Sequence, residues 1–431
     1  MKIIGATVCI ALFAASSRAQ TPADSLRLSA LRAASTAHDP RASQMELLAT
    51  QSALRLKNIA NDLKPSLSIN AMGQYQSDVA SVPISLPGVS LPVPPHDTYD
   101  ARLNAEQRIY DPSLNARRSV ERAQLAESQA RVRTALYALN ESVNAAFYTA
   151  LRSQVAVREL ETTLTDLQAQ LDIAEKRVKQ GTALPSESNA LRAELLRRRQ
   201  TIAEQNAARK AAIAILSDLT GTRIDSLTPI ASPDLAAEAA AARTNLAALR
   251  ARPEYEQFSR SREVLDQTAN ATRAQEMPRL SAFGRAGYGR PGLKFLTDKF
   301  DSYWIGGIRF QWTPWTWGSS SRERQIAQLQ KRIVDTEEKA FTDQLQRAIE
   351  QDLATIDRLE SSLADDDRII ALRESILTET RSRYREAVIM SSEYVDRQTD
   401  VLSARLTRAT HRVELSQAQA HLLTTLGAEV R

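Results

Sequence analysis

Residue types that often carry out chemistry are sparse in this sequence. The four histidines, His38, His96, His411 and His421, have no second histidine nearby at a spacing that would bind a metal ion. The sequence contains no P-loop, no nucleophile elbow and no credible catalytic triad. We therefore predict that the protein is not an enzyme and has no catalytic residues, no metal site and no cofactor.

Two polar runs that resemble sites are better explained by helix structure. The run 318–321 (Gly-Ser-Ser-Ser) has the residue types that cap the start of a helix. The triple aspartate 365–367 is most simply a solvated helix face. The sequence also contains no nucleotide-binding motif.

The elements around these residues are expected to be long helices. Aromatic residues make up 5% of the 431 residues, and the chain has only 13 glycines and 16 prolines. Such a composition is typical of extended helical proteins rather than of mixed globular folds. The near balance of charge, with 56 Lys and Arg against 51 Asp and Glu, excludes the basic stripe of a nucleic-acid-binding protein.

Residues 1–19 have the features of a signal peptide. Lys2 precedes a mostly apolar run over 3–14, and Ser17 and Ala19 supply the small residues that signal peptidase prefers. The only cysteine, Cys9, lies in this segment without the small-residue context of a lipoprotein cleavage site. We expect an exported mature chain that lacks cysteine, disulfides and a lipid anchor.

The rest of the chain is organised as a tandem repeat. The segment 65–68 (Pro-Ser-Leu-Ser) returns as 278–281 (Pro-Arg-Leu-Ser), and Leu216 with Gly221 returns as Leu422 with Gly427. We predict repeat 1 over 20–225 and repeat 2 over 226–431, which together form one structural domain. Each repeat is expected to run in the order helix, two strands, long helix, return helix.

Apolar and polar residues alternate in two segments of each repeat, as they do in strands with one apolar and one polar face. These segments are 67–75, 99–109, 280–288 and 303–312. In an outer membrane the apolar face would contact lipid, and four strands are too few to close a barrel. Several chains must then share one barrel. The alternative is a soluble four-stranded sheet that packs on helices.

Long helices without internal glycine or proline separate the strands from two breaks, near 181–185 and 387–390. Helices from about 112 to 180 and from about 319 to 386 would each be roughly 100 Å long. Shorter helices are predicted over about 22–63, 185–219, 241–276 and 391–426. Two short helices placed end to end would match one long helix and pack beside it as a coiled coil.

These features, taken in order, resemble the TolC-like outer-membrane factor family, also called the outer membrane efflux protein family. The resemblance is carried by Pro65, Pro278, the turns after 107–111 and 311–312, the run 177–181 and the closing runs 211–221 and 418–427. It implies a mainly α fold: helical hairpins that form an α-barrel, and strands from three chains that share a twelve-stranded transmembrane β-barrel.

The resemblance also implies a function and partners. A family member would be an outer-membrane exit duct of a tripartite efflux or type I secretion system, with a large periplasmic part. As a homotrimer in outer-membrane lipid, it would work with a periplasmic adaptor and an inner-membrane transporter. Drugs, metal ions and secreted proteins could all use such a duct, because the pump selects the cargo.

The family's docking and gating residues correspond to the two breaks. The adaptor-docking tips would be Gly181, Thr182, Ala183 and Leu184 in repeat 1, and Ala387, Val388, Ile389 and Met390 in repeat 2. Ala387 replaces the usual glycine, which makes docking at the second tip less secure. The matching positions for the periplasmic gate are Glu393 and Asp396, which share one helix face. The alternatives are plain interhelical turns and solvated surface acids.

A second function class remains open from sequence alone. A periplasmic structural coiled coil or adhesion protein would share the long helices but would need no lipid-facing strands. The apolar loop 81–95, rich in proline, would be a stiff extracellular loop or a constriction at the mouth of a duct.

Overall fold

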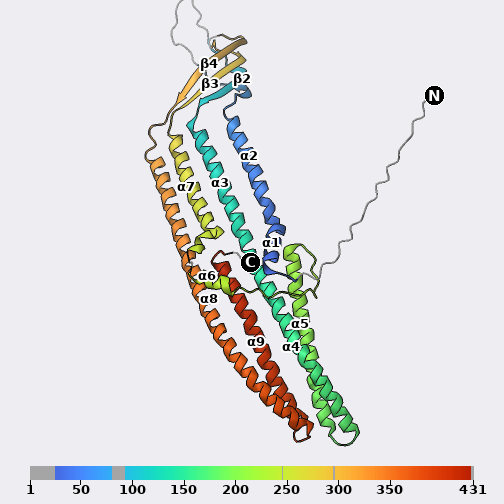
Figure 1. Ribbon diagram of the computed structural model, residues 1–431. Helices are drawn as coiled ribbons and strands as arrows, with labels where there is room; N and C mark the ends of the chain where they lie inside the picture. The colour runs from blue at the N-terminus through green and yellow to red at the C-terminus, as the bar shows by residue number, and fades with distance from the viewer. Residues whose placement is uncertain (1–24, 80–92, 245, 295–296, 429–431) are drawn as a thin grey trace, which may run out of the picture.

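The structure is a computed structural model that describes residues 25–79, 93–244, 246–294 and 297–428. The predicted signal peptide, 1–19, and most of the loop 81–95 lie outside these residues. The molecule is elongated, with a small sheet at one end and two helical hairpin tips at the other (Figure 1). Among the described residues, no helix has the length and apolar character needed to cross a membrane.

The order of the elements repeats along the chain. In the first half they are α1 (Leu28–His38), η1 (Pro40–Ser43), α2 (Gln44–Asn61), β1 (Ser66–Tyr75), β2 (Asp97–Tyr110), α3 (Pro112–Tyr137), α4 (Leu139–Lys179) and α5 (Pro185–Thr220). In the second half they are α6 (Ala236–Thr244), η2 (Leu246–Ala251), α7 (Pro253–Gln275), β3 (Arg279–Arg290), β4 (Asp301–Gln311), α8 (Ser319–Arg385) and α9 (Ser391–Thr425). Both halves run in the order helix, two strands, long helix and return helix.

The four predicted strands form one antiparallel sheet in the order β1-β2-β3-β4. The register places Ile69 opposite Leu103, Leu103 opposite Ala286, and Ala286 opposite Trp304, so the apolar positions form one continuous face. Ile69 is 83% exposed and Trp304 is 79% exposed. Within the described residues, therefore, this apolar face has no cover.

The longest helix is α8, whose 67 residues span about 100 Å. The corresponding rod of the first half was predicted as one helix, but it is divided at Ala138 into α3 and α4. Ala138 keeps helical angles, φ −61° and ψ −20°, and Glu141 N–H donates to its carbonyl at 3.3 Å. The division is therefore a local tightening of an otherwise continuous rod.

Two predicted helices are interrupted in the structure. The segment expected as one helix over about 22–63 breaks before Pro40, and the segment over about 241–276 breaks before Pro253. Proline lacks an N–H and disfavours helical angles in the preceding residue. Accordingly Asp39 and Arg252 adopt extended ψ angles of 128° and 141°.

The short helices meet end to end beside the long rods, as predicted. Gly221 at the end of α5 packs so closely on the His38 ring of α1 that a Cβ there would lie 2.2 Å from Nδ1. At the end of α9, Arg252 donates from Nη1 to the Thr425 carbonyl at 3.0 Å. A cation at the C-terminal end of a helix is favourable for the helix dipole.

The main core lies midway along the molecule, where α1, α4, α5 and α9 converge. Phe147 and Tyr148 from α4, Leu216 from α5 and Leu423 from α9 are all at most 1% exposed. Burial of side chains of this size stabilises the fold by about 2 kcal/mol each. This core holds the two repeats together and leaves the hairpins to extend beyond it (Figure 1).

Candidate functional site

The first hairpin tip connects α4 to α5 through a turn at Gly181. The Thr182 N–H donates to the Arg177 carbonyl at 2.9 Å, and the Gly181 N–H donates to the Val178 carbonyl at 3.0 Å. This pair of bonds is the Schellman pattern that ends helices. Gly181 adopts φ +71°, a left-handed angle that glycine reaches without steric cost.

The second hairpin tip repeats this pattern with a different residue at the turn. The Val388 N–H donates to the Arg383 carbonyl at 2.9 Å, and the Ala387 N–H donates to the Tyr384 carbonyl at 3.1 Å. Ala387 has φ +58°. Its Cβ makes this left-handed conformation costly by about 1 kcal/mol or more relative to glycine.

The two tips contact each other. From the first hairpin, Arg177 donates to the Arg385 carbonyl at 2.8 Å and to the Tyr384 carbonyl at 3.4 Å, at the end of α8. From the second hairpin, the Ser391 hydroxyl donates to the Glu187 carbonyl on α5 at 3.1 Å. The structure therefore brings together the two segments that the sequence analysis singled out 206 residues apart.

A small apolar core supports both tips from within. The rings of Tyr384 and Tyr394 stack with their centroids 5.1 Å apart, and both side chains are at most 1% exposed. The apolar residues around them, from the first hairpin, are Leu167, Leu171, Ala174, Leu191 and Leu195. Because this core takes side chains from both hairpins, neither tip can move far without disturbing the other.

Asp166 of α4 forms the polar connection between the hairpins. Its carboxylate accepts a hydrogen bond from the Tyr394 hydroxyl at 2.8 Å and one from Gln398 Nε2 at 2.9 Å, and it pairs with Arg381. Burial and the bond to the Asp166 carboxylate raise the pKa of Tyr394 to about 12. The hydroxyl therefore stays protonated and remains a donor at neutral pH.

Several predicted docking residues form an exposed apolar surface at the extreme end of the molecule. Leu184 of the first tip is 63% exposed, and Val388 and Met390 of the second are 63% and 66% exposed. Gly181, Thr182 and Ala387 are also exposed, whereas Ala183 and Ile389 are half-buried. Single exposed apolar residues are common, but three at one narrow end are suited to contact with another molecule.

The two predicted gate residues lie on the exposed side of α9. Glu393 and Asp396 flank the buried Tyr394 in sequence but are themselves exposed, and neither forms an ion pair with any residue that the structure describes. The first-repeat counterpart of Glu393 is Glu187, which is half-buried, and Ala190 occupies the position of Asp396. The pair of exposed acids is therefore a feature of the second hairpin alone.

Within the described residues, no three His, Cys, Asp or Glu side chains are grouped closely enough to hold a metal ion. The arrangement at the tips is instead one of packing, capping and surface charge. Such a site can bind another protein or influence ions that pass it.

Comparison with known proteins bears on the fold and the broad function. The sequence profile of the family described as outer membrane efflux protein matches residues 31–222. Residues 31–222 are thus similar to the outer membrane efflux protein family. No curated protein matches it by sequence.

Solved structures share the fold of this chain over almost its whole length. One is CusC, described as undergoing conformational changes during transmembrane channel formation, with 15% identity, a TM-score of 0.70 and 96% of both chains covered. Another is the outer membrane protein VceC from Vibrio cholerae, with 14% identity, a TM-score of 0.67, and 94% of this chain and 97% of that chain covered. A third is the open-state MtrE outer membrane channel of Neisseria gonorrhoeae, with 16% identity, a TM-score of 0.64, and 94% and 90% covered.

The family match over 31–222 and the shared fold point to the same broad function. The protein is an outer-membrane efflux channel with a large periplasmic helical part, and the matched family is one of channels rather than of enzymes. The alternative of a periplasmic coiled-coil or adhesion protein without a pore receives no support. The roles of individual residues at the tips remain predictions.

Sequence reasoning missed the residues that hold the two tips together. The run 177–181 was noted only as part of the resemblance, although Arg177 caps the other hairpin. Asp166 gave no signal, because its partners Tyr394 and Gln398 lie 228 and 232 residues away. The only local hint was the pair Tyr384 and Tyr394, which are symmetric about the turn at 387–390.

Proposed function

We propose that three copies of this channel assemble into one exit duct for a tripartite efflux or type I secretion system. The observation that carries the proposal is the four-stranded sheet, which has one exposed apolar face and two strands, β1 and β4, paired on one side only. A polar backbone edge within lipid is too costly to persist. Pairing β1 of one chain with β4 of the next satisfies both edges.

Three chains are the number that this sheet and the family resemblance favour. Closed outer-membrane sheets need about eight or more strands, so one chain is insufficient. Three chains would supply twelve strands, and the twelve-stranded assembly is the one that the resemblance implies. The helical rods would then enclose a periplasmic tunnel that continues the same passage.

We further propose that the periplasmic adaptor docks on the exposed tips. Leu184, Val388 and Met390 present apolar side chains at the end farthest from the sheet, where a periplasmic partner would meet the duct (Figure 1). The partner would in turn connect the duct to an inner-membrane transporter. That transporter supplies the energy, because we infer that this chain performs no chemistry of its own.

Glu393 and Asp396 are proposed to form the periplasmic constriction. Three copies would place six carboxylates around the mouth, and crowded acids attract cations. The exposure of both side chains, and the absence of a cationic partner for either among the described residues, leave their charge free to act on passing ions.

The trimer is tested by fractionation and gel migration. The protein should appear in the outer-membrane fraction and migrate as a trimer that dissociates on heating. A monomer in the soluble periplasmic fraction would reject the duct.

Docking is tested by changing the charge of the second tip. Val388→Asp with Met390→Asp should abolish export in cells while trimer amounts stay unchanged, because charge opposes burial of an apolar contact. The matched control, Val388→Leu, keeps an apolar side chain and should export normally. Unimpaired export by the double aspartate variant would exclude the second tip from docking.

The constriction is tested in planar bilayers. Glu393→Gln with Asp396→Asn should change single-channel conductance and weaken block by divalent cations. The control, Asp365→Asn with Asp367→Asn, removes equal charge from α8 away from the tips. Equal behaviour of both variants would reject a specific role for Glu393 and Asp396.

A further inference from the structure

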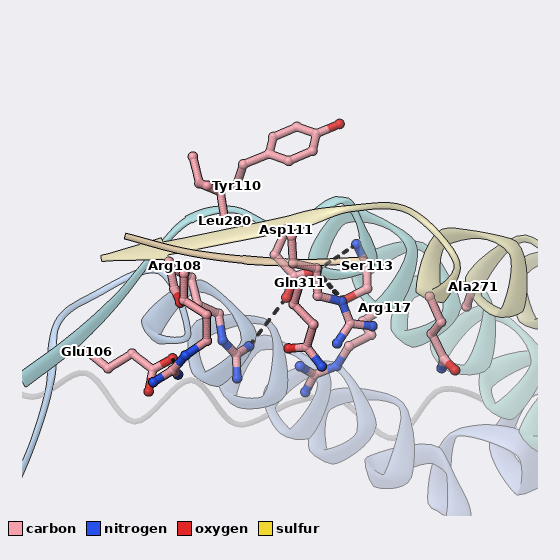
Figure 2. A pocket seen from close by; sticks show the side chains of 13 residues that line it. Glu106, Arg108, Tyr110, Asp111, Ser113, Arg117, Ala271, Leu280 and Gln311 are labelled. Atoms are coloured by element: carbon pink, nitrogen blue, oxygen red, sulfur yellow. Dashed lines mark hydrogen bonds and ion pairs between the residues drawn. The ribbon is translucent and has the colours of Figure 1, made fainter. Parts of the chain in front are cut away.

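A cavity of about 480 Å³ lies where the sheet joins the helical rods, on the polar side of the sheet. Its charged lining residues are Arg108, Arg117, Arg279, Arg309, Glu106 and Asp111. Figure 2 shows Arg108, Asp111, Arg117 and Gln311 on one side of the strands, whereas Tyr110 and Leu280 point away on the other. The cavity is thus separated from the apolar face by the thickness of one sheet.

Two of the four arginines have a close acidic partner. Arg117 donates to Asp62 at 2.7 Å, and Arg309 donates to Glu106 at 3.2 Å. All four arginine side chains remain between 39% and 51% exposed. Their guanidinium groups are therefore accessible to a solute in the cavity.

The other two arginines share a carboxylate that already serves a different purpose. Asp111 caps α3 by accepting hydrogen bonds from Ser113 N–H at 3.0 Å and Ser113 Oγ at 2.6 Å. Arg108 and Arg279 each approach this carboxylate only to 3.7 Å, which is too long for a hydrogen bond, and Arg108 also lies 3.5 Å from the Asp62 carboxylate that Arg117 binds. Neither forms a hydrogen bond with any side chain or carbonyl in the described part of the chain.

Positive charge is therefore in excess at this junction. Four arginines face three carboxylates, those of Asp62, Glu106 and Asp111. The whole polar face of the sheet has the same imbalance: its arginines are Arg102, Arg108, Arg279, Arg285 and Arg309, and its acids are Asp100, Glu106 and Asp301. An anion would find both surplus charge and unused donors.

We propose that this cavity is an anion-binding site for solutes that travel through the duct, and that it takes carboxylate, sulfonate or phosphate groups. Arg108 and Arg279 both lie 3.7 Å from the Asp111 carboxylate, so their planar guanidinium groups are near enough for one anionic group beside Asp111 to accept hydrogen bonds from both. The site rests on the proposed trimeric duct, in which the polar face of the sheet lines the passage. Three copies would form a cationic collar between the membrane-embedded end and the periplasmic tunnel.

A solute is favoured over a lipid headgroup by the side on which the cavity opens. Tyr110 and Leu280 belong to the apolar face that would contact lipid, and the charged lining lies on the opposite face (Figure 2). A headgroup would have to cross the sheet to reach Arg108. A dissolved anion and a lipid headgroup would offer the same chemical groups. The cavity opens toward the water-filled passage, so its position favours the dissolved anion.

The test uses the full-length trimer in planar bilayers of phosphatidylcholine, with pyrophosphate as the probe. Pyrophosphate should reduce the single-channel current of the wild type in a saturable manner. In the variant Arg108→Gln with Arg279→Gln, the half-blocking concentration should rise about tenfold, because two charge-assisted contacts are lost. Arg108→Lys with Arg279→Lys should give an intermediate value, because the charge remains but the planar fork is lost.

The matched control removes two arginines from the same face of the sheet outside the cavity. Arg102→Gln with Arg285→Gln should leave the half-blocking concentration within about twofold of the wild type. Heat-dependent gel migration establishes that each variant still forms trimers. If a glutamine variant does not form trimers, the variant with lysine at the same two positions is used in its place.

The outcomes separate this site from the duct itself. A wild type that forms no conducting channel would overturn the proposed duct and this site with it. A conducting channel blocked equally in wild type, glutamine variant and control would overturn the site alone. Arginine-dependent retention of phosphatidylglycerol by purified trimers, without block by pyrophosphate, would assign the cavity to lipid and overturn the solute assignment.

Discussion

The two hairpins have the same turn geometry but are stabilised differently. The first tip has glycine at its left-handed position and receives no side-chain cap from the second hairpin among the described contacts. The second tip has Ala387 at that position, with φ +58°. The Arg177 guanidinium of the first hairpin donates a hydrogen bond to the Arg385 carbonyl at the end of α8. The strained tip is therefore the one that its neighbour supports.

This difference shows that hydrogen bonding, rather than the presence of glycine, sets the turn. Both tips close with the same pair of backbone bonds. At the second tip, the cap from Arg177 and the stacked pair of Tyr384 and Tyr394 offset the strain of Ala387. The second hairpin should accordingly be more dependent on the first than the reverse.

The largest effect is expected from Asp166→Ala, which removes the carboxylate that joins the hairpins. Arg381, Tyr394 and Gln398 would lose their shared acceptor, at a cost of about 2–3 kcal/mol. Hydrogen exchange should show faster opening of 377–400 than of 167–195. Asp172→Ala, an exposed neighbour on α4, should change little. Equal exchange in both segments would contradict the dependence of one hairpin on the other.

Opposite substitutions at the two turns should have opposite effects. Gly181→Ala should destabilise the first tip by about 1 kcal/mol through backbone strain alone, since a Cβ there would meet nothing within 4 Å. Ala387→Gly should stabilise the second tip by about 0.5 kcal/mol, because relief of strain exceeds the entropy gained by the unfolded chain. The unfolding temperatures of the two variant trimers measure both effects. If both unfolding temperatures shift in the same direction, the backbone strain at Ala387 is rejected.

Loss of the cap should affect only the second tip. Arg177→Gln removes the cation from the end of α8 and should cost roughly 0.5–1 kcal/mol. The effect should grow at low salt, where the helix dipole is less screened. Exchange rates at 386–390 give the measurement. Lys179→Gln, an exposed residue of the same turn, is the control and should leave those rates unchanged.

The smallest expected effect is a dependence of stability on pH at the second hairpin. A 2.7 Å bond to Asp352 raises the pKa of His421, whose counterpart in the first repeat is Ile215. Because the folded pKa is raised, the stabilisation is complete below the unfolded value of about 6.5 and is lost as pH rises through the folded value.

Its size should be less than about 0.5 kcal/mol, because the histidine is partly exposed. Comparing unfolding temperatures at pH 5.5 and 8.5 in wild type and Asp352→Asn would detect it. A pH dependence that persists in Asp352→Asn would assign the effect to another group.

Local patterns were sufficient to predict the strands and the long rods. The alternation over 67–75 predicted β1 to within one residue, and Gly318 marked the start of α8. The breaks at Pro40 and Pro253 were missed because apolar periodicity continues across them, although proline should have taken precedence. In each of these cases the deciding interactions lie within a few residues.

The tips could be located but not understood from sequence. The turn at Gly181 is a local feature, whereas the contact of Arg177 with Arg385 spans 208 residues. The same holds for the arginine cavity, in which residues of β2, β3 and β4 meet only through the register of the sheet. Contacts between residues so far apart in the sequence depend on how the helices and strands pack. The apolar periodicity of the sequence does not specify that packing.

The half-paired edges of β1 and β4 have a genetic consequence. In the proposed trimer every chain completes its sheet on both neighbours, so a defective chain damages assemblies that also contain intact chains. A substitution that blocks passage without blocking pairing should therefore be dominant when co-expressed with the wild type. One that destroys an edge should be recessive, because the altered chain would be excluded from assembly.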